Sequence, residues 1–146
     1  MSLFIAFSCF ALDQFSKWVA RNALVNGSVD LGWFRFDLVF NTGAAYGMFS
    51  NATSVLLWVG VAVIGYLLFT LSSLLKTQLD AWLYGFILGG AMGNTFDRLW
   101  FGNVTDFINI HIIPVFNLAD VWLNCGFCLM LVQVILYGRK NPTHMV

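Results

Sequence analysis

Long apolar stretches alternate with shorter polar segments along this chain. Four of them approach the roughly 20 residues that an α-helix needs to cross the apolar part of a bilayer. They cover residues 2–21, 54–75, 81–98 and 118–137. The second is the most uniformly apolar, and the third is rich in Gly and Ala toward its end. The pattern predicts an all-α integral membrane protein, in which a single membrane-embedded domain spanning residues 1–146 forms a four-helix transmembrane bundle.

The segment between the first two stretches, residues 22–53, carries structure of its own. Residues 29–41 alternate in part between apolar and polar side chains, which is typical of strands. A turn of small residues follows, at Gly43, Ala44, Ala45 and Gly47. We expect a small extracytoplasmic β-sheet in this first outer loop. In the second outer loop, residues 99–117, we expect the apolar run 107–116 to dip into the membrane interface.

Composition supports the membrane class and indicates an orientation. The chain is 60% hydrophobic and 10% charged, whereas soluble domains carry roughly 25% charged residues. Its net charge is zero, so nothing favours nucleic acid as a partner. Lys76 lies between the second and third stretches, and Arg139 and Lys140 follow the fourth. Because basic residues favour the cytoplasmic side, we expect both termini inside and both long loops outside.

Two carboxylates, Asp106 and Asp120, stand fourteen positions apart beside the fourth stretch. An acid at the edge of a membrane span is costly unless it is paired or used. The third helix would end, and the fourth would begin, at the same outer face, which brings both carboxylates there. Each residue alone is also compatible with a turn or a helix cap.

As a pair, these carboxylates predict a definite chemistry. Close carboxylates cannot both ionise easily, so they tend to share one proton. In that state one can activate a water against a peptide carbonyl while the other donates a proton to the carbonyl oxygen. No Ser–His arrangement competes with this interpretation. No His/Cys/Asp spacing indicates a metal site, and we expect no cofactor.

Other polar residues fall inside the predicted helices. Asp13 and Lys17 share one helix face, either as a neutral pair that bridges helices or as part of a substrate site. Asn94 and Arg98 share a face beside Asp97, and Arg98 can fork onto a carboxylate or a phosphate or extend toward the interface. Small residues that permit close helix contact precede them, at Gly89, Gly90 and Gly93.

Five sequence blocks, taken in order, resemble the lipoprotein signal peptidases, the type II signal peptidases of bacteria. The blocks are DQFSK at 13–17, NTGAAYG at 41–47, GGAMGNTFDR at 89–98, VTDFI at 104–108 and FNLAD at 116–120. One block alone would be a weak signal, but five with matching order and spacing are specific. The chain departs from the family pattern at Asn109, where a second Asp is frequent, and at Tyr46, where Phe is common. Neither departure removes a carboxylate of the pair.

The resemblance implies a function and a set of site residues. Members are four-span inner-membrane aspartic endopeptidases with an extracytoplasmic sheet, and they cut prolipoproteins just before a diacylglyceryl-modified cysteine. By resemblance, Asp106 and Asp120 form the catalytic dyad. The remaining site and support residues would be Asn41, Gly43, Asn94, Arg98, Asn117, Asp13, Lys17 and Asp97. The implied partners are lipid-modified prolipoproteins, membrane lipid and the antibiotic globomycin, which occupies the same site in family members, and we expect a monomer.

Two alternatives from other classes remain at this point. A small proton-coupled transporter also buries Asp and Lys in its spans, but the four stretches show no inverted repeat. Its acids would also be expected near the midplane, where Asp13 alone is predicted to lie. A structural membrane subunit, whose polar groups merely pair helices, is the second alternative.

Overall fold

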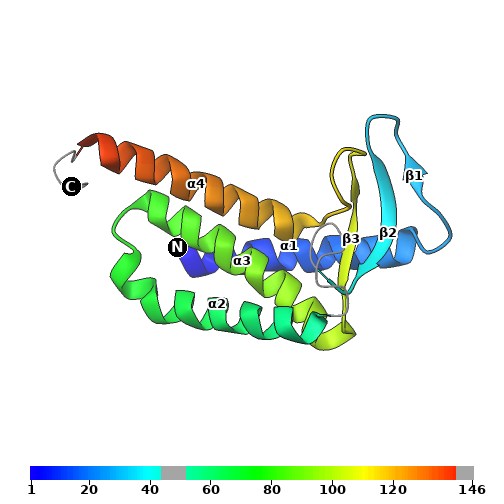
Figure 1. Ribbon diagram of the computed structural model, residues 1–146, viewed down its shortest axis with the longest axis horizontal. Coiled ribbons are helices and arrows are strands. Elements are labelled where there is room, and N and C mark those ends of the chain that lie inside the picture. Colours follow the sequence, from blue (N-terminus) through cyan, green and yellow to red (C-terminus); the bar gives the residue numbers. More distant parts are fainter. Residues whose placement is uncertain (44–51, 141–146) are drawn as a thin grey trace.

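The computed structural model describes residues 1–43 and 52–140 as four helices and three strands. In chain order these are α1 (Ser2–Ala23), β1 (Val29–Asp30), β2 (Arg35–Asn41), α2 (Thr53–Leu74), α3 (Gln78–Phe101), β3 (Val104–Asn109) and α4 (Leu118–Lys140). The helices run side by side along the long axis of the molecule, and the sheet stands across one end of the bundle (Figure 1). The predicted four-helix membrane fold with a small sheet is therefore confirmed.

Helix α3 is the centre of the bundle, since it contacts α1, α2 and α4. Its glycines allow this close approach: a Cβ at Gly89 would lie 2.6 Å from Cys9 Cβ, and one at Gly90 would lie 2.5 Å from the carbonyl oxygen of Ala119. Of the helices in the described residues, α1, α2 and α4 are long and apolar enough to cross a membrane. The third predicted span, α3, does not meet that measure, because it carries Asp80, Asp97 and Arg98 in a more polar sequence.

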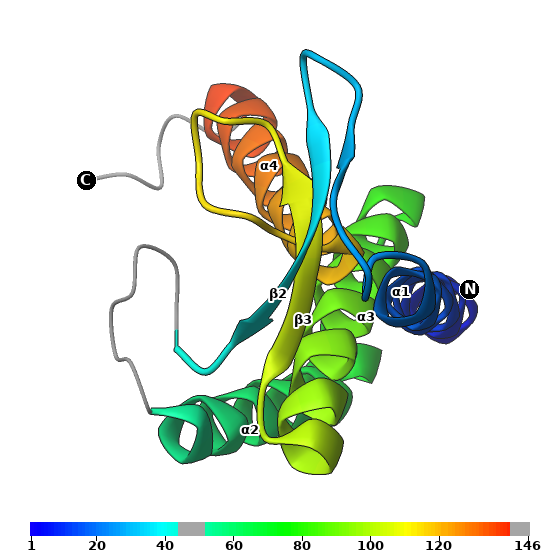
Figure 2. The same ribbon diagram turned by 90° about the vertical axis from the view of Figure 1, so that its right-hand side faces the viewer.

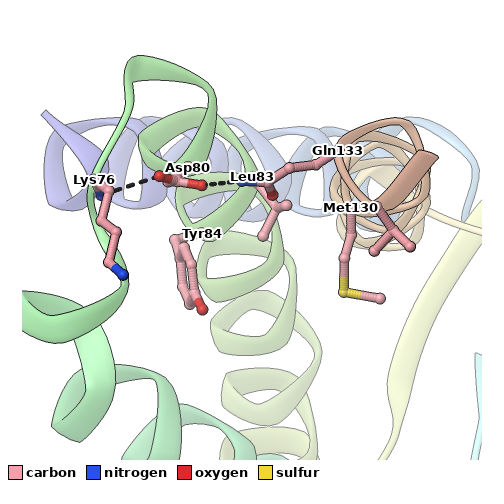
Figure 3. Close-up of a pocket in the computed structure, with 7 residues that line it drawn as sticks. Lys76, Asp80, Leu83, Tyr84, Met130 and Gln133 are labelled. Atoms are coloured by element: carbon pink, nitrogen blue, oxygen red, sulfur yellow. Dashed lines mark hydrogen bonds between the residues drawn. The ribbon is translucent and has the colours of Figure 1, made fainter. Parts of the chain in front are cut away.

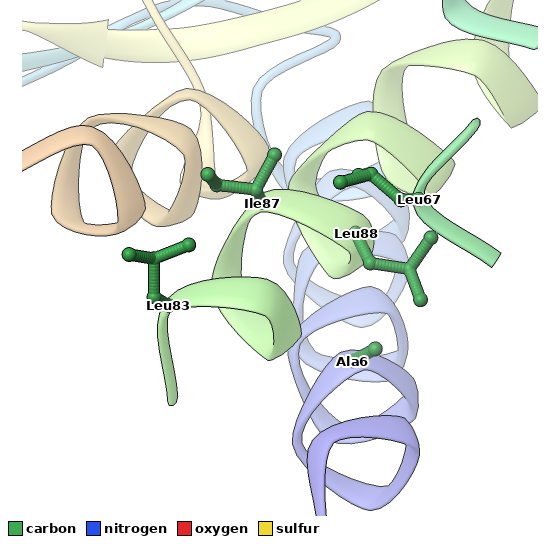
Figure 4. Packing of buried hydrophobic residues seen from close by; sticks show 5 residues of the cluster. All are labelled: Ala6, Leu67, Leu83, Ile87 and Leu88. Atoms are coloured by element: carbon green, nitrogen blue, oxygen red, sulfur yellow. The ribbon is translucent and has the colours of Figure 1, made fainter. Parts of the chain in front are cut away.

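The apolar core of the bundle joins three of the helices. Leu83, Ile87 and Leu88 of α3 pack with Ala6 of α1 and Leu67 of α2 (Figure 4). All five are buried, whereas most of the outer surface of α2 is exposed. An apolar surface of this kind is stable only against lipid.

The sheet is antiparallel with the strand order β1-β2-β3. Strand β2 pairs with β3 from Arg35 opposite Asn109 to Asn41 opposite Val104, with an irregularity between Phe36 and Val39. Viewed from the sheet end, β2 and β3 cross in front of the helices (Figure 2). The third strand comes from the second predicted outer loop. Its residues 107–109, expected to dip into the interface, instead complete the sheet, because their backbone groups pair with β2 and with Phe116.

Candidate active site

Asp106 and Asp120 reach the sheet end of the bundle from different elements. Asp106 lies in β3, opposite Val39 of β2, and Asp120 lies in the first turn of α4. Asp106 is 3% exposed. The sheet therefore positions one carboxylate and the start of a helix positions the other, as the sequence predicts for residues that meet at one face.

Asn117 connects the two carboxylates. Its side-chain Nδ2 donates to Asp106 Oδ1 at 2.6 Å, and its backbone N–H donates to Asp120 Oδ2 at 3.2 Å. Its Oδ1 accepts from the backbone N–H of Asp120 at 3.1 Å, so Asn117 and Asp120 form a reciprocal cap at the start of α4. Asp120 therefore takes part in a helix cap, a role that is compatible with the predicted pairing of the two carboxylates.

Two further asparagines donate to the carboxylates. Asn41, the last residue of β2, donates through Nδ2 to Asp106 Oδ2 at 2.9 Å. Asn94 of α3 donates through Nδ2 to Asp120 Oδ1 at 2.8 Å. Each carboxylate therefore accepts two N–H groups, which stabilises the charged form of a carboxylate.

Burial acts against these donors at Asp106. Loss of hydration raises the pKa of Asp106 to about 6, and the nearby charge of Asp120 acts in the same direction. The bonds from Asn41 and Asn117 and the charge of Lys17 lower that pKa and offset part of the rise. A carboxyl with a pKa near 6 can hold the single proton of an acid pair close to neutral pH.

A family model described as "Signal peptidase (SPase) II" matches residues 5–136. The chain belongs to the signal peptidase II family. Proteins called "Lipoprotein signal peptidase" are among its relatives. The one from Gloeobacter violaceus is 36% identical over 146 residues, covering 94% of this chain and 83% of the relative. The one from a Nostoc species is 40% identical over 147 residues, covering 94% and 89%.

The fold also matches a solved structure. A protein described as "Bacterial membrane enzyme structure by the in meso method at 2.3 A resolution" superposes with a TM-score of 0.81, 24% identity and coverage of 99% of this chain and 91% of that one. Membership of the signal peptidase II family makes this chain an aspartic peptidase and a multi-pass protein of a bacterial membrane. The transporter and structural-subunit alternatives are therefore set aside.

Next to the Asp106/Asp120 pair, the signal peptidase II chain buries a cluster of charges. Lys17 Nζ lies 2.9 Å from Asp13 Oδ2 and 3.3 Å from Asp97 Oδ2, and the three side chains are 0% exposed. Arg21 adds a second cation, 3.1 Å from Asp97 Oδ1. Gln14 Nε2 donates to the carboxylates of both Asp13 and Asp97. The predicted Asp13–Lys17 pair exists, and it bridges α1 to α3.

Arg98 lies at the edge of the same site and has no carboxylate partner among the described residues. Its Nη2 donates to the carbonyl oxygen of Gly43 at 3.3 Å, and its Nε is buried without a hydrogen-bond partner there. Gly43 in turn donates its N–H to Asn41 Oδ1 at 2.9 Å. Arg98 and Gly43, both expected at the site, thus lie next to Asn41, which donates to Asp106. The other residues of the small-residue turn, Ala44, Ala45 and Gly47, lie outside the described residues.

Two residues of the site were missed by sequence reasoning. Arg21 donates through Nε to Thr105 Oγ1 at 2.8 Å, next to Asp106 in the chain. A signal for Arg21 was present, because it follows Lys17 by four positions and so continues the polar face of α1. Thr105 carried no such signal, since its contacts depend on the path of β3.

A separate cavity of about 370 Å³ lies near the opposite end of the bundle. Its lining residues are Lys76, Asp80, Leu83, Tyr84, Met130, Gln133 and Val134 (Figure 3). Asn94 follows Asp80 by fourteen positions, or about 21 Å along α3, so this cavity is separate from the site around Asp106 and Asp120. Within residues 1–43 and 52–140, no cluster of His, Cys, Asp or Glu is arranged to hold a metal ion.

Proposed function

We propose that this peptidase removes the signal peptide from bacterial prolipoproteins and cuts just before a diacylglyceryl-modified cysteine. Asp106 and Asp120 would form the catalytic dyad. The observation that carries the proposal is the double contact of Asn117, which joins both carboxylates at the end of a membrane-spanning bundle. The relatives' common name, lipoprotein signal peptidase, supplies the substrate class.

The chemistry follows from a pair that shares one proton. Asp106, whose pKa burial raises to about 6, would carry the proton and donate it to the oxygen of the scissile carbonyl. Asp120 would take a proton from a water as that water attacks the carbonyl carbon. The tetrahedral intermediate would then collapse: the C–N bond breaks, the amine takes a proton from Asp120, and a hydroxyl of the intermediate returns its proton to Asp106 as the carboxyl product forms. This leaves the pair with one proton, ready for the next cycle.

The remaining residues would hold the dyad and the substrate. Asn41, Asn94 and Asn117 orient the carboxylates through the bonds described above. Arg98, with its unpaired Nε, is suited to donate a hydrogen bond to a carbonyl or ester oxygen of the lipid-modified peptide. Asp13, Lys17 and Asp97 would support the site from below without touching the substrate, since all three are 0% exposed.

We place the enzyme in the bacterial inner membrane with both termini in the cytoplasm. The sheet and the dyad would then face the outer leaflet. Lys76, Arg139 and Lys140 would lie on the cytoplasmic side. Membrane lipid would surround the bundle, a globomycin-type inhibitor would compete for the dyad site, and the enzyme would act as a monomer.

The deciding experiment uses the purified full chain in lipid with two forms of one precursor. The diacylglyceryl-modified prolipoprotein should be cleaved at the bond before the modified cysteine, and the unmodified form should not. Mass spectrometry of the products identifies the bond. Cleavage of both forms at equal rates would contradict the substrate assignment, and cleavage of neither would contradict the function.

A further inference from the structure

Lys17 is a fully buried lysine whose ammonium contacts three different groups. Its Nζ lies 2.9 Å from Asp13, 3.3 Å from Asp97 and 3.0 Å from Asn94 Oδ1. An ammonium has three N–H donors, so each donor has one acceptor available. Lys17 belongs to α1, whereas Asp97 and Asn94 belong to α3. The side chain thus fixes one point at which the two helices cross.

The two carboxylates held by Lys17 each accept a backbone N–H beside the dyad. Asp13 Oδ1 accepts from Ala119 at 2.8 Å, and Ala119 directly precedes Asp120. Asp97 Oδ2 accepts from Thr105 at 3.0 Å, and Thr105 directly precedes Asp106. The same arrangement therefore occurs twice, once for each carboxylate of the dyad, and one ammonium lies between the two.

Lys17, together with Asn117 Nδ2, which donates to the same oxygen at 3.1 Å, also fixes the orientation of the Asn94 side-chain amide. Its ammonium can only donate, so Asn94 must present Oδ1 to it. The other end of that amide, Nδ2, then faces Asp120 Oδ1 at 2.8 Å. The reversed amide would place an oxygen against the carboxylate and would lose both bonds.

We infer that Lys17 is a positioning residue that sets the spacing and orientation of the Asp106/Asp120 pair. It does so through Asp13 to the start of α4, through Asp97 to β3, and through Asn94 to Asp120 itself. The inference rests on the proposed function, because it assumes that the pair is catalytic. Displacement of reacting groups by about 1 Å can cost about 100-fold in rate, so loss of this tie should reduce turnover more than substrate binding.

A purely structural role for Lys17 makes different predictions. In that case its removal would lower stability but leave the rate of the folded fraction and its pH dependence unchanged. Several charged groups lie beside the ammonium or beside the carboxylates it acts on. They are Asp13 and Arg21 on α1, Asp97 and Arg98 on α3, Asp106 on β3 and Asp120 on α4.

The first test is Lys17→Met, with Lys76→Met in the exposed α2–α3 connection as the matched control. We expect kcat of folded Lys17→Met to fall about 100-fold while KM changes little, because Lys17 is 0% exposed and cannot touch substrate. The alkaline limb of its pH profile should move to higher pH, since a cation that favours ionised Asp106 is lost. Lys76→Met should behave like the parent in both measurements.

A second variant guards against misfolding. Asp13→Asn combined with Lys17→Met removes one charge of each sign, and the introduced amide oxygen can still accept from Ala119. Asp97 keeps Arg21 as its counter-ion. This variant should fold, with a thermal midpoint close to that of the parent, and should show the same loss of kcat. Faster exchange of the Thr105 amide proton would report the loosened tie without reference to activity.

The outcomes separate the inference from the function on which it rests. A folded Lys17 variant with kcat within about twofold of the parent and an unmoved pH limb would overturn the positioning role. Failure of the charge-balanced variant to fold would also count against it, because Lys17 would then be needed for folding rather than for placement. If Asp106→Asn retained full activity, the proposed dyad itself would be wrong.

Discussion

Asn117 donates its side-chain amide to Asp106 across 2.6 Å and is itself completely buried. The same residue begins α4 and exchanges two bonds with Asp120. The side chain of Asn117 thereby fixes the first turn of α4 relative to strand β3. Because the dyad is held by this contact and by two other asparagines, replacing its parts should give separable effects.

Replacing either dyad carboxylate by its amide should abolish cleavage without preventing folding. In Asp106→Asn and Asp120→Asn the shape is kept, but the pair can no longer share a proton while one member acts as a base. We expect kcat to fall by about 10⁴-fold or more, measured by cleavage of a lipid-modified precursor. Asp30→Asn, in β1 at the edge of the sheet, is the matched control and should remain fully active. Full activity in either dyad variant would contradict the assignment.

Asn41→Ala should move the pH dependence of the enzyme. Asn41 donates to Asp106 and lowers its pKa, so its removal raises that pKa above about 6. The active pair needs its proton, and activity falls as pH rises through the pKa at which the proton is lost. The alkaline limb of kcat/KM should therefore shift to higher pH, by about one unit. The control Asn22→Ala, which alters an exposed side chain of α1, should leave the alkaline limb in place. A shift of the limb to lower pH in Asn41→Ala would contradict the placement of the proton on Asp106.

Gly89→Ala should weaken the packing of α1 against α3. The added Cβ would lie 2.6 Å from Cys9 Cβ and 2.7 Å from the carbonyl oxygen of Ala6, and backbone cannot move aside cheaply. We expect a loss of about 1–3 kcal/mol in the free energy of unfolding, measured by denaturation in mixed micelles. Gly65→Ala in α2 meets no atom within 4 Å. It should stabilise the helix by about 0.5–1 kcal/mol, and equal effects at the two positions would contradict the packing described.

Asp37 should make the sheet sensitive to acid. Its carboxylate accepts from Ser28 at 2.5 Å, Asn109 at 2.6 Å and Arg35 at 2.9 Å, and these bonds lower its pKa to about 2. A lowered pKa means that Asp37 stabilises the fold above its ordinary value near 4 and loses this effect as pH falls toward 2. The thermal midpoint of Asp37→Asn should be lower at neutral pH and should depend less on pH between 4 and 2. Asp30→Asn should retain the acid dependence of the parent.

The distribution of apolar residues was sufficient to predict the helices. A bilayer requires long apolar segments, so α2 and α4 could be located closely from sequence. The helix predicted at 81–98 was located as well, as part of α3, but it is not apolar enough to meet the measure for a membrane span. Strand β3 was not predicted, because residues 104–109 pair with β2, some 65 positions earlier, as the bond between Asn41 and Asp106 illustrates. Strand partners that distant leave no local pattern.

The sequence by itself determined which residues can carry the chemistry. Acids, asparagines and a lysine in an apolar chain are costly, so their presence at 13–17, 94–98, 106 and 117–120 already marked a site. Only the tertiary structure decided how they act on one another. The contact between Asp13 and Ala119 joins residues 106 positions apart, and it exists because glycines let α3 approach both α1 and α4. Hydrogen bonds require placement within a fraction of an ångström, and that placement comes from the packing of the whole bundle.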